Sequence, residues 1–254
     1  MLVLIAESKT RAPCDRAVSV AEYAAHRPAL EDVADEVMSR LRTMPAEDLS
    51  ERTGLSMPMS RRLRHMIYEF PNKALGCEAI EAFTGVVFKA FGYSSLDIVA
   101  RQRTNSCVRI LSSAYGWLRP DDIVKPYRFD YTMRLADGSR QLAAFWRDAV
   151  TECVLRDMES EGSGQLLNLL PADAARCIDW KRVMARGEVW SADFREIRPG
   201  GVMRTPNAGR LKTLRGKLLR QIVTQPIADA AALAVAEGDG YVADRKITFL
   251  CADY

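Results

Sequence analysis

The densest group of residues able to do chemistry lies between Leu111 and Arg134, where aromatic and cationic side chains alternate. The members that we single out are Tyr115, Trp117, Arg119, Lys125, Tyr127, Arg128 and Arg134. Rings can stack on bases while cations neutralise phosphates, so this alternation is typical of a surface that holds nucleic acid. The alternative is a loop whose rings pack into the core while Arg119 and Arg128 pair with Asp122 and Asp130.

Lys9 lies shortly after the apolar run at the start of the chain, between Ser8 and Thr10. If that run is a buried strand, Lys9 lies near its carboxyl end, where open α/β sheets usually bind ligands. We therefore expect an anion contact at Lys9. The alternative is that Lys9 only marks the point where the strand reaches the surface.

A third cationic feature is the helix predicted from about Gly209 to Val223. Its apolar residues Leu211, Leu214, Leu218 and Ile222 form one stripe, and its candidate anion contacts are Lys212, Arg215, Lys217 and Arg220. Such a helix packs with one face and presents charge with the others. Gly216 in mid-helix is unfavourable by about 1 kcal/mol relative to alanine, which predicts the close approach of another backbone or a ligand there.

The segment from Leu49 to Tyr68 has the outline of a helix-hairpin-helix element. One helix ends near Gly54 and the next, which carries Arg61 and Arg62, begins near Pro58. Hairpin amides and the positive end of a helix can meet a phosphate. The alternative is a plain helical turn, which is a common connection.

The charge of the chain is regional rather than extreme. The formal net charge is +3, but residues 181–220 carry eleven Lys and Arg residues against three Asp and Glu residues. A basic region of this kind is the electrostatic footprint of a phosphate-rich partner. A solvated helix face is the alternative interpretation.

Several classes of site are disfavoured by what the chain lacks. The six cysteines form no C-x-x-C pair, and the two histidines have no ligand spacing, so we expect reduced core thiols, no disulfide framework and no metal site. The common nucleotide, hydrolase and metalloprotease motifs are absent, and we expect no cofactor.

The elements that must position these residues follow from hydrophobic periodicity. Strands are predicted at Leu2 to Ile5, Val108 to Leu111, Leu166 to Leu170, Val189 to Ile197 and Ile247 to Cys251, the first, third and last in the centre of a sheet. Helical periodicity follows Pro28 and recurs from Leu142 to Cys153. We expect one α/β (mixed α+β) domain over residues 1–254, a central mixed sheet flanked by helices, and a helical excursion at about residues 28–78.

No apolar run is long enough to span a membrane, and the first residues lack the basic region and cleavage site of a signal peptide. We therefore expect a cytoplasmic protein that makes no membrane contact. A monomer is the expected form.

Five segments together resemble the YaaA family of peroxide stress proteins. They are A-E-S-K-T at residues 6–10, L-S-S-A-Y-G-W-L-R-P-D-D-I-V-K-P-Y-R at 111–128, F-W-R-D at 145–148, N-L-L at 168–170 and L-K-T-L-R-G-K-L-L-R-Q-I at 211–222. The resemblance implies a bacterial cytosolic protein of mixed α/β fold, with a positively charged cleft and a helix-hairpin-helix element. It further implies DNA binding and a role in limiting iron-driven oxidative damage.

The chain departs from the family pattern at three positions that concern function. Val86 stands where the family has an acid, and Pro171 and Ala174 stand in a stretch where the family has a serine and a tyrosine. Any shared reaction that needs those polar groups is in doubt for this chain.

Three functions compete at this point. The first is sequence-nonspecific DNA binding through the cations named above. The second is an enzyme of unknown reaction that acts on a nucleotide or phosphorylated substrate in the same cleft, with Tyr127 or Asp130 as the proton-transfer group. The third is a scaffold whose basic face binds an acidic protein. The DNA-binding hypothesis requires that Lys9, the segment 111–134 and the helix near Lys212 face one cleft.

Overall fold

The computed structural model describes residues 1–135, 140–197, 203–225, 227, 229–230, 232–233, 240–243 and 246–252. Its centre is a sheet in which five parallel strands lie side by side: β4 (Val108–Ser112), β1 (Leu2–Ala6), β7 (Gln165–Asn168), β8 (Glu188–Ile197) and β11 (Lys246–Ala252). Antiparallel β5 (Gly116–Leu118) lies beside β4, and antiparallel β10 (Gly240–Ala243) lies beside β11. The two-residue strand β9 (Met203–Arg204) pairs with β8.

All five strands predicted from hydrophobic runs are present, and they are the five parallel strands of the sheet. Their order differs from the expectation in one respect. The last run forms β11, which lies between β8 and the outer strand β10, whereas β1 and β7 are central as expected. Order is a non-local property, so the apolar content of a run does not determine its place in the sheet.

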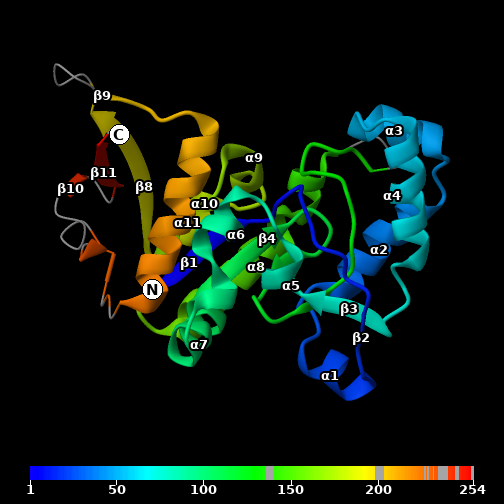
Figure 1. The fold of residues 1–254 in the computed structure, drawn as a ribbon, viewed down its shortest axis with the longest axis horizontal. Helices are drawn as coiled ribbons and strands as arrows, with labels where there is room; N and C mark the ends of the chain where they lie inside the picture. Colours follow the sequence, from blue (N-terminus) through cyan, green and yellow to red (C-terminus); the bar gives the residue numbers. More distant parts are fainter. Residues whose placement is uncertain are drawn as a thin grey trace.

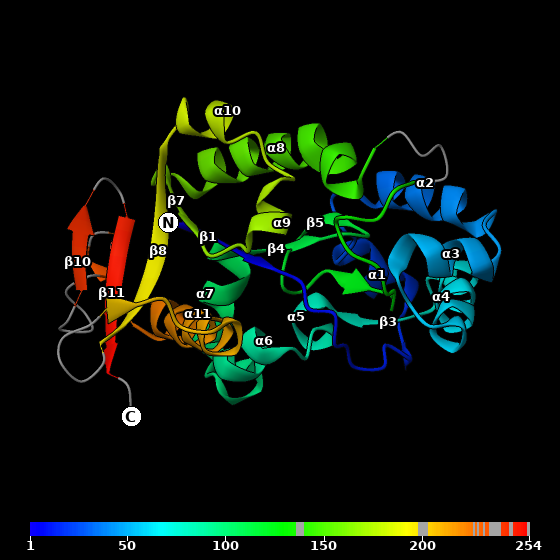
Figure 2. The same cartoon turned by 90° about the horizontal axis from the view of Figure 1, so that it is seen from above.

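Helices cover both faces of this sheet, as parallel strands require. Figure 2 shows α8 (Leu142–Glu161) and α10 (Trp180–Met184) on one face, and α6 (Val86–Phe91), α7 (Ile98–Cys107) and α11 (Ala208–Thr224) on the other. The stripe predicted for α11 is confirmed, because Leu214, Leu218 and Ile222 are buried. The short helix α9 (Ala172–Ala175) follows β7.

The predicted helical excursion at about residues 28–78 is present as α2 (Glu31–Arg42), α3 (Ala46–Thr53) and α4 (Met57–Glu69). Together with α1 (Val20–Ala25) and a small sheet of β2 (Arg16–Ala17), β3 (Leu75–Glu78) and β6 (Ile123–Val124), it forms the other half of the molecule (Figure 1). The short helices α5 (Ala79–Ala82) and η1 (Tyr93–Ser95) complete the elements. One buried apolar cluster includes Leu41 and Leu63 of this half and Leu4 of β1, so the predicted single compact α/β domain is confirmed.

The turn between α3 and α4 satisfies its amides internally. Gly54 adopts a left-handed conformation with φ of 67°, and its N–H donates to the carbonyl of Ser50 at 2.9 Å. The N–H of Leu55 donates to Oγ1 of Thr53 at 3.3 Å. The two predicted helices are present, whereas phosphate contact by their hairpin stays a prediction.

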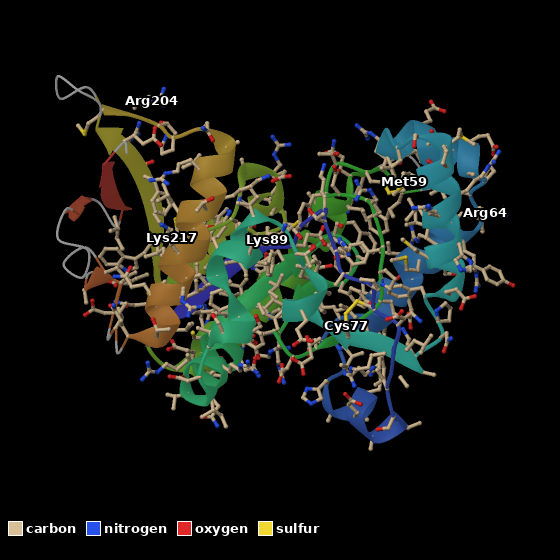
Figure 3. All side chains as sticks on the ribbon, viewed as in Figure 1. Met59, Arg64, Cys77, Lys89, Arg204 and Lys217 are labelled. Carbon is tan, nitrogen blue, oxygen red and sulfur yellow. A yellow bond between two sulfur atoms is a disulfide. The ribbon has the colours of Figure 1, made fainter. Side chains whose placement is uncertain are left out.

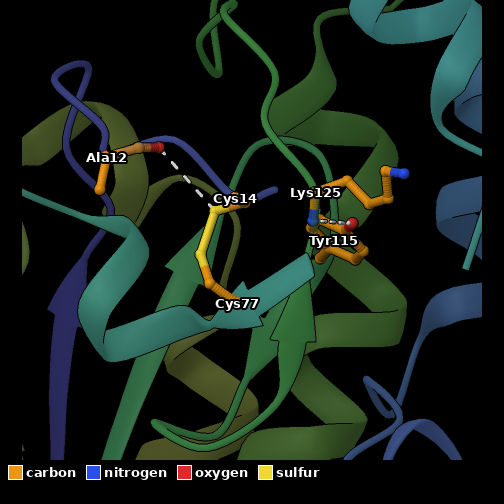
Figure 4. The surroundings of a disulfide bond; sticks show 5 residues. All are labelled: Ala12, Cys14, Cys77, Tyr115 and Lys125. Atoms are coloured by element: carbon orange, nitrogen blue, oxygen red, sulfur yellow. Dashed lines mark hydrogen bonds between the residues drawn. A yellow bond between two sulfur atoms is a disulfide. The ribbon is translucent and has the colours of Figure 1, made fainter. Parts of the chain in front are cut away.

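The structure pairs Cys14 with Cys77 in a disulfide (Figure 4), so the expectation of reduced thiols is wrong for these two residues. They lie 63 positions apart in the sequence and become neighbours only because the segment after β1 runs back against β3. Cys107, Cys153 and Cys177 are free thiols whose pKa is raised by burial.

None of the helices in the described part of the chain has both the length and the apolarity that crossing a bilayer requires.

Candidate functional site

A cavity of about 300 Å³ opens beside the carboxyl ends of β1 and β7. Strand β4 is added on one side of β1, and the later strands β7 and β8 are added on the other side. A topological switch point therefore lies between the parallel strands β1 and β7. Ligands of open α/β sheets bind in the crevice at such a switch point. The lining residues are Ala6, Glu7, Ser8, Lys9, Thr10, Gly85, Val86, Val87, Phe88, Asp130, Tyr131, Pro171, Asp173 and Lys212.

The wall opposite β1 is held close by Gly85. A Cβ at this position would lie 2.5 Å from Cβ of Ser8, and the Gly85 N–H donates to Oγ of Ser8 at 3.0 Å. Only glycine permits this approach without displacement of the neighbouring chain. It brings the first residues of α6 against the end of β1 and narrows the cavity.

Lys9 and Asp130 form an ion pair beside the cavity. Nζ of Lys9 lies 2.8 Å from Oδ2 of Asp130, and Nη1 of Arg128 donates to the backbone carbonyl of Lys9 at 2.9 Å. Burial acts to raise the pKa of Asp130, but hydrogen bonds from Lys9 and Thr132 outweigh it and hold this pKa below its ordinary value. Lys9 and the segment 128–130 therefore meet, as the DNA-binding hypothesis requires.

Helix α11 brings Lys212 to the same cavity. The helix can approach α6 closely because residue 216 is glycine: a Cβ there would lie 2.3 Å from the backbone oxygen of Val87 and 2.7 Å from Cβ of Ala90. The predicted close approach of a backbone at Gly216 is thus confirmed.

The lining of the cavity is of mixed charge rather than cationic. Lys9 and Lys212 face three carboxylates, those of Glu7, Asp130 and Asp173. Nearby, Arg215 is half-buried, and burial lowers its pKa while the charge of Asp173 opposes that change. The cavity is therefore not the cationic cleft that was expected from the sequence.

A buried network lies beneath the cavity around Glu7, which the sequence reasoning missed. Its carboxylate accepts hydrogen bonds from the Tyr127 hydroxyl, from Oγ of Ser113 at 2.6 Å and from Nη2 of Arg11 at 3.0 Å. The Arg11 guanidinium lies 3.3 Å from the centroid of the Tyr127 ring. The position of Glu7 directly after a buried strand was the available signal, since that is where ligand-side residues of α/β sheets lie.

The two tyrosines predicted to stack on a ligand are buried. Tyr115 and Tyr127 are each 1% exposed, and the Tyr115 hydroxyl accepts a hydrogen bond from the backbone N–H of Lys125. Burial raises the pKa of both hydroxyls, and a proton-transfer role for Tyr127 stays a prediction. Their rings instead support the loop that carries Arg128 and Asp130.

Three predicted anion contacts lie away from the cavity. Strand β5 runs antiparallel to β4 and pairs Leu118 with Ile110, so Arg119 lies toward the amino end of β4. Nη1 of Arg220 donates to the carbonyls of Phe91 and Gly92 and thereby caps α6. Lys217 is about 140° around α11 from Lys212, because the two residues are five positions apart in the helix.

The remaining predicted contacts belong to the helical half of the molecule. Arg134 is exposed and lines a shallow depression together with Arg52, Asp48 and Glu51 of α3. Arg61 and Arg62 are exposed on α4, where Figure 3 shows the neighbouring Arg64 at the outer edge of the molecule. In the described ranges no group of three or more His, Cys, Asp or Glu side chains is arranged to hold a metal ion.

Comparison with known protein families identifies the family of this chain. The family model described as peroxide stress protein YaaA matches residues 1–247. The chain belongs to the YaaA family of peroxide stress proteins. This membership supports a stress-related role.

Individual YaaA-family relatives are divergent in sequence. A UPF0246 protein of Parabacteroides distasonis is 26% identical over 246 residues, which cover 95% of this chain and 93% of the relative. A UPF0246 protein of Burkholderia orbicola is 28% identical over 224 residues, covering 86% and 85%. One of Rhizorhabdus wittichii is 32% identical over 165 residues, covering 64% of each chain.

Two of the departures from the YaaA pattern lie in the cavity. Val86 and Pro171 both line it, whereas Ala174 is fully buried in α9. Both residues contribute apolar surface to the cavity.

Proposed function

We propose that this YaaA-family protein binds DNA without reading its sequence and thereby limits iron-driven oxidative damage to the DNA during peroxide stress. The supporting observation is the meeting of Lys9, Arg128 and Lys212 at one edge of the sheet, although they come from three segments distant in the sequence. Cations that gather in this way neutralise phosphates, and phosphate contacts supply sequence-independent affinity.

The surface proposed to meet DNA is smaller than the set predicted from the sequence. It contains the rim cations Lys9, Arg128, Lys212 and Arg215 beside the cavity, and Arg134 in the depression beside α3. Arg119 and Lys217 face elsewhere, and the Arg220 guanidinium is occupied by α6. Gly54, Arg61 and Arg62 form a second proposed contact on the helical half.

The test is a titration of a fluorescein-labelled DNA duplex, followed by anisotropy at several salt concentrations between 50 and 200 mM. If five phosphates are neutralised, log K should fall against log[salt] with a slope of about −4.5. Lys212→Ala and Lys9→Ala should each reduce the steepness by about one unit. The matched control is Arg119→Ala, because Arg119 is exposed and lies toward the amino end of β4, whereas the cavity lies at the carboxyl ends of the strands.

Binding that is insensitive to salt would overturn the proposal. So would an Arg119→Ala variant that loses as much affinity as Lys212→Ala. We propose further that the protein acts in the cytoplasm as a monomer. Light scattering of the purified protein, with and without the duplex, measures its molar mass, and we expect the mass of a single chain.

A further inference from the structure

We propose that the cavity beside β1 and β7 is a separate binding site for a small phosphorylated molecule with a planar apolar body, of the nucleoside monophosphate class. This inference goes beyond DNA binding, because a cavity of about 300 Å³ cannot admit a duplex. That volume is at the lower end of the range for small-ligand pockets.

One wall of the cavity is apolar. It is formed by Val86, Val87 and Phe88 at the start of α6 and by Pro171 after β7. The Val86 side chain is 43% exposed, so apolar surface faces the opening without a protein partner to cover it. Pockets for organic ligands are mostly apolar with a few placed polar groups, and this wall suits the face of a heterocyclic ring.

The cavity also carries the groups that would hold a phosphate. The Lys9 side chain is 73% exposed while it pairs with Asp130, and an exposed pair of this kind is weak enough for a ligand anion to replace it. Lys212 lines the same cavity from α11. Two lysines that converge from different elements are suited to a phosphate monoester.

The carboxylates give the site selectivity for a ligand that also has donors. Asp130 uses Oδ1 to accept from the N–H and hydroxyl of Thr132, which fixes its orientation toward Lys9. Asp173 uses Oδ1 for the N–H of Ala174 at 3.0 Å. Both carboxylates line the cavity, and when a ligand phosphate replaces the Asp130 contact of Lys9, Oδ2 of Asp130 becomes available to accept from ribose hydroxyls or an exocyclic amine.

The location agrees with this ligand class for a geometric reason. The cavity lies at the switch point between β1 and β7, and the Gly85 contact with Ser8 keeps α6 tight against the strand end. The crevice outside such a switch point is where doubly wound sheets bind nucleotides.

The experiment is isothermal titration calorimetry of the full chain with adenosine monophosphate, adenosine, ribose 5-phosphate and inorganic phosphate. We expect saturable one-to-one binding of the monophosphate, at least tenfold tighter than that of any of the other three. Lys212→Ala should weaken it about tenfold or more, and Val86→Trp should abolish it by filling the cavity. The matched control is Lys217→Ala, an exposed lysine of the same helix that faces away from the cavity.

Two outcomes would overturn the site. The first is unchanged affinity in Val86→Trp, and the second is a monophosphate affinity no greater than that of inorganic phosphate. Duplex binding by the same variants separates this inference from the proposed function. Val86→Trp should retain DNA binding, because its indole would fill the cavity without removing a rim cation. If the unmodified protein binds the monophosphate but not the duplex, the proposed function fails and this inference stands.

Discussion

Single side chains in this protein owe their chemistry to the backbone around them. Asp122 is an example: it is 2% exposed, and Oδ2 accepts from the backbone N–H of Arg119 at 2.8 Å. Burial raises its pKa to about 7, and the hydrogen bond from Arg119 only partly offsets that effect. A pairing of Asp122 with Arg119 was one of two alternatives left open by the sequence, and in the structure Asp122 accepts from the backbone N–H of Arg119.

This environment predicts a pH-dependent stability. The folded state holds a proton on Asp122 up to about pH 7, whereas the unfolded chain releases it near its ordinary pKa of about 3.9. The free energy of unfolding should therefore fall as the pH rises from about 4 to about 7, by roughly 2–4 kcal/mol from this residue. Asp122→Asn keeps an acceptor for Arg119 and should remove this fall.

Urea denaturation at pH 4.5 and pH 7.5 measures the effect in the unmodified protein and in Asp122→Asn. The exposed Asp15→Asn serves as the matched control and should follow the unmodified protein. Parallel pH profiles for Asp122→Asn and the unmodified protein would refute this assignment.

At the scale of elements, the contact between α6 and α11 determines whether the cavity has two lysines or one. The contact depends on Gly216, where a Cβ would meet the backbone oxygen of Val87 and Cβ of Ala90. Arg220 adds a cap to the carboxyl end of α6 from the same helix. The periodicity of α11 predicted its buried stripe, but only the contact explains why a glycine lies within the helix.

Gly216→Ala should destabilise the protein by about 2 kcal/mol. Overpacking against a backbone is unfavourable by about 1–3 kcal/mol and exceeds the propensity gain of at most about 1 kcal/mol. Gly209→Ala in the same helix is the control, because its nearest atom, Oδ1 of Asn207, lies at an ordinary 3.4 Å. Thermal or urea unfolding of both variants measures the difference, and equal changes in stability would contradict the packing argument.

At the scale of the molecule, one disulfide closes a loop around the helical half. Cys14 and Cys77 enclose all of α1 to α4, and the bond joins the segment after β1 to the small sheet. The apolar cluster is shared between the two halves, so stabilisation of the loop should act on the whole domain.

Reduction of this bond should lower the free energy of unfolding by roughly 2–4 kcal/mol, because a loop of this length gains chain entropy when it is released. Urea denaturation with and without dithiothreitol measures the change by tryptophan fluorescence, whose four reporters all lie outside the loop. The double variant Cys14→Ala/Cys77→Ala should respond to neither condition. A reductant effect of equal size in that variant would contradict the assignment.

The sequence by itself determined the local elements and several of their special positions. Five strands, the helices from residue 142 and near residue 209, and the close approach at Gly216 were all predicted correctly, whereas the parallel direction of the strands was not predicted. The placement of Lys9 beside a strand end was also predicted. These features depend on periodicity and on the conformational needs of single residues, which neighbours along the chain define.

Only the tertiary structure decided which charged groups meet. Strand β5 runs antiparallel to β4 and carries Arg119 away from the cavity, toward the amino end of β4. Arg220 caps α6 instead of facing the cavity. The rings of Tyr115 and Tyr127 are buried, and the acids Glu7 and Asp173 enter a cavity that was expected to be cationic. Pairing of Cys14 with Cys77 has the same cause, since contacts between segments distant in sequence depend on strand order and helix packing rather than on local spacing.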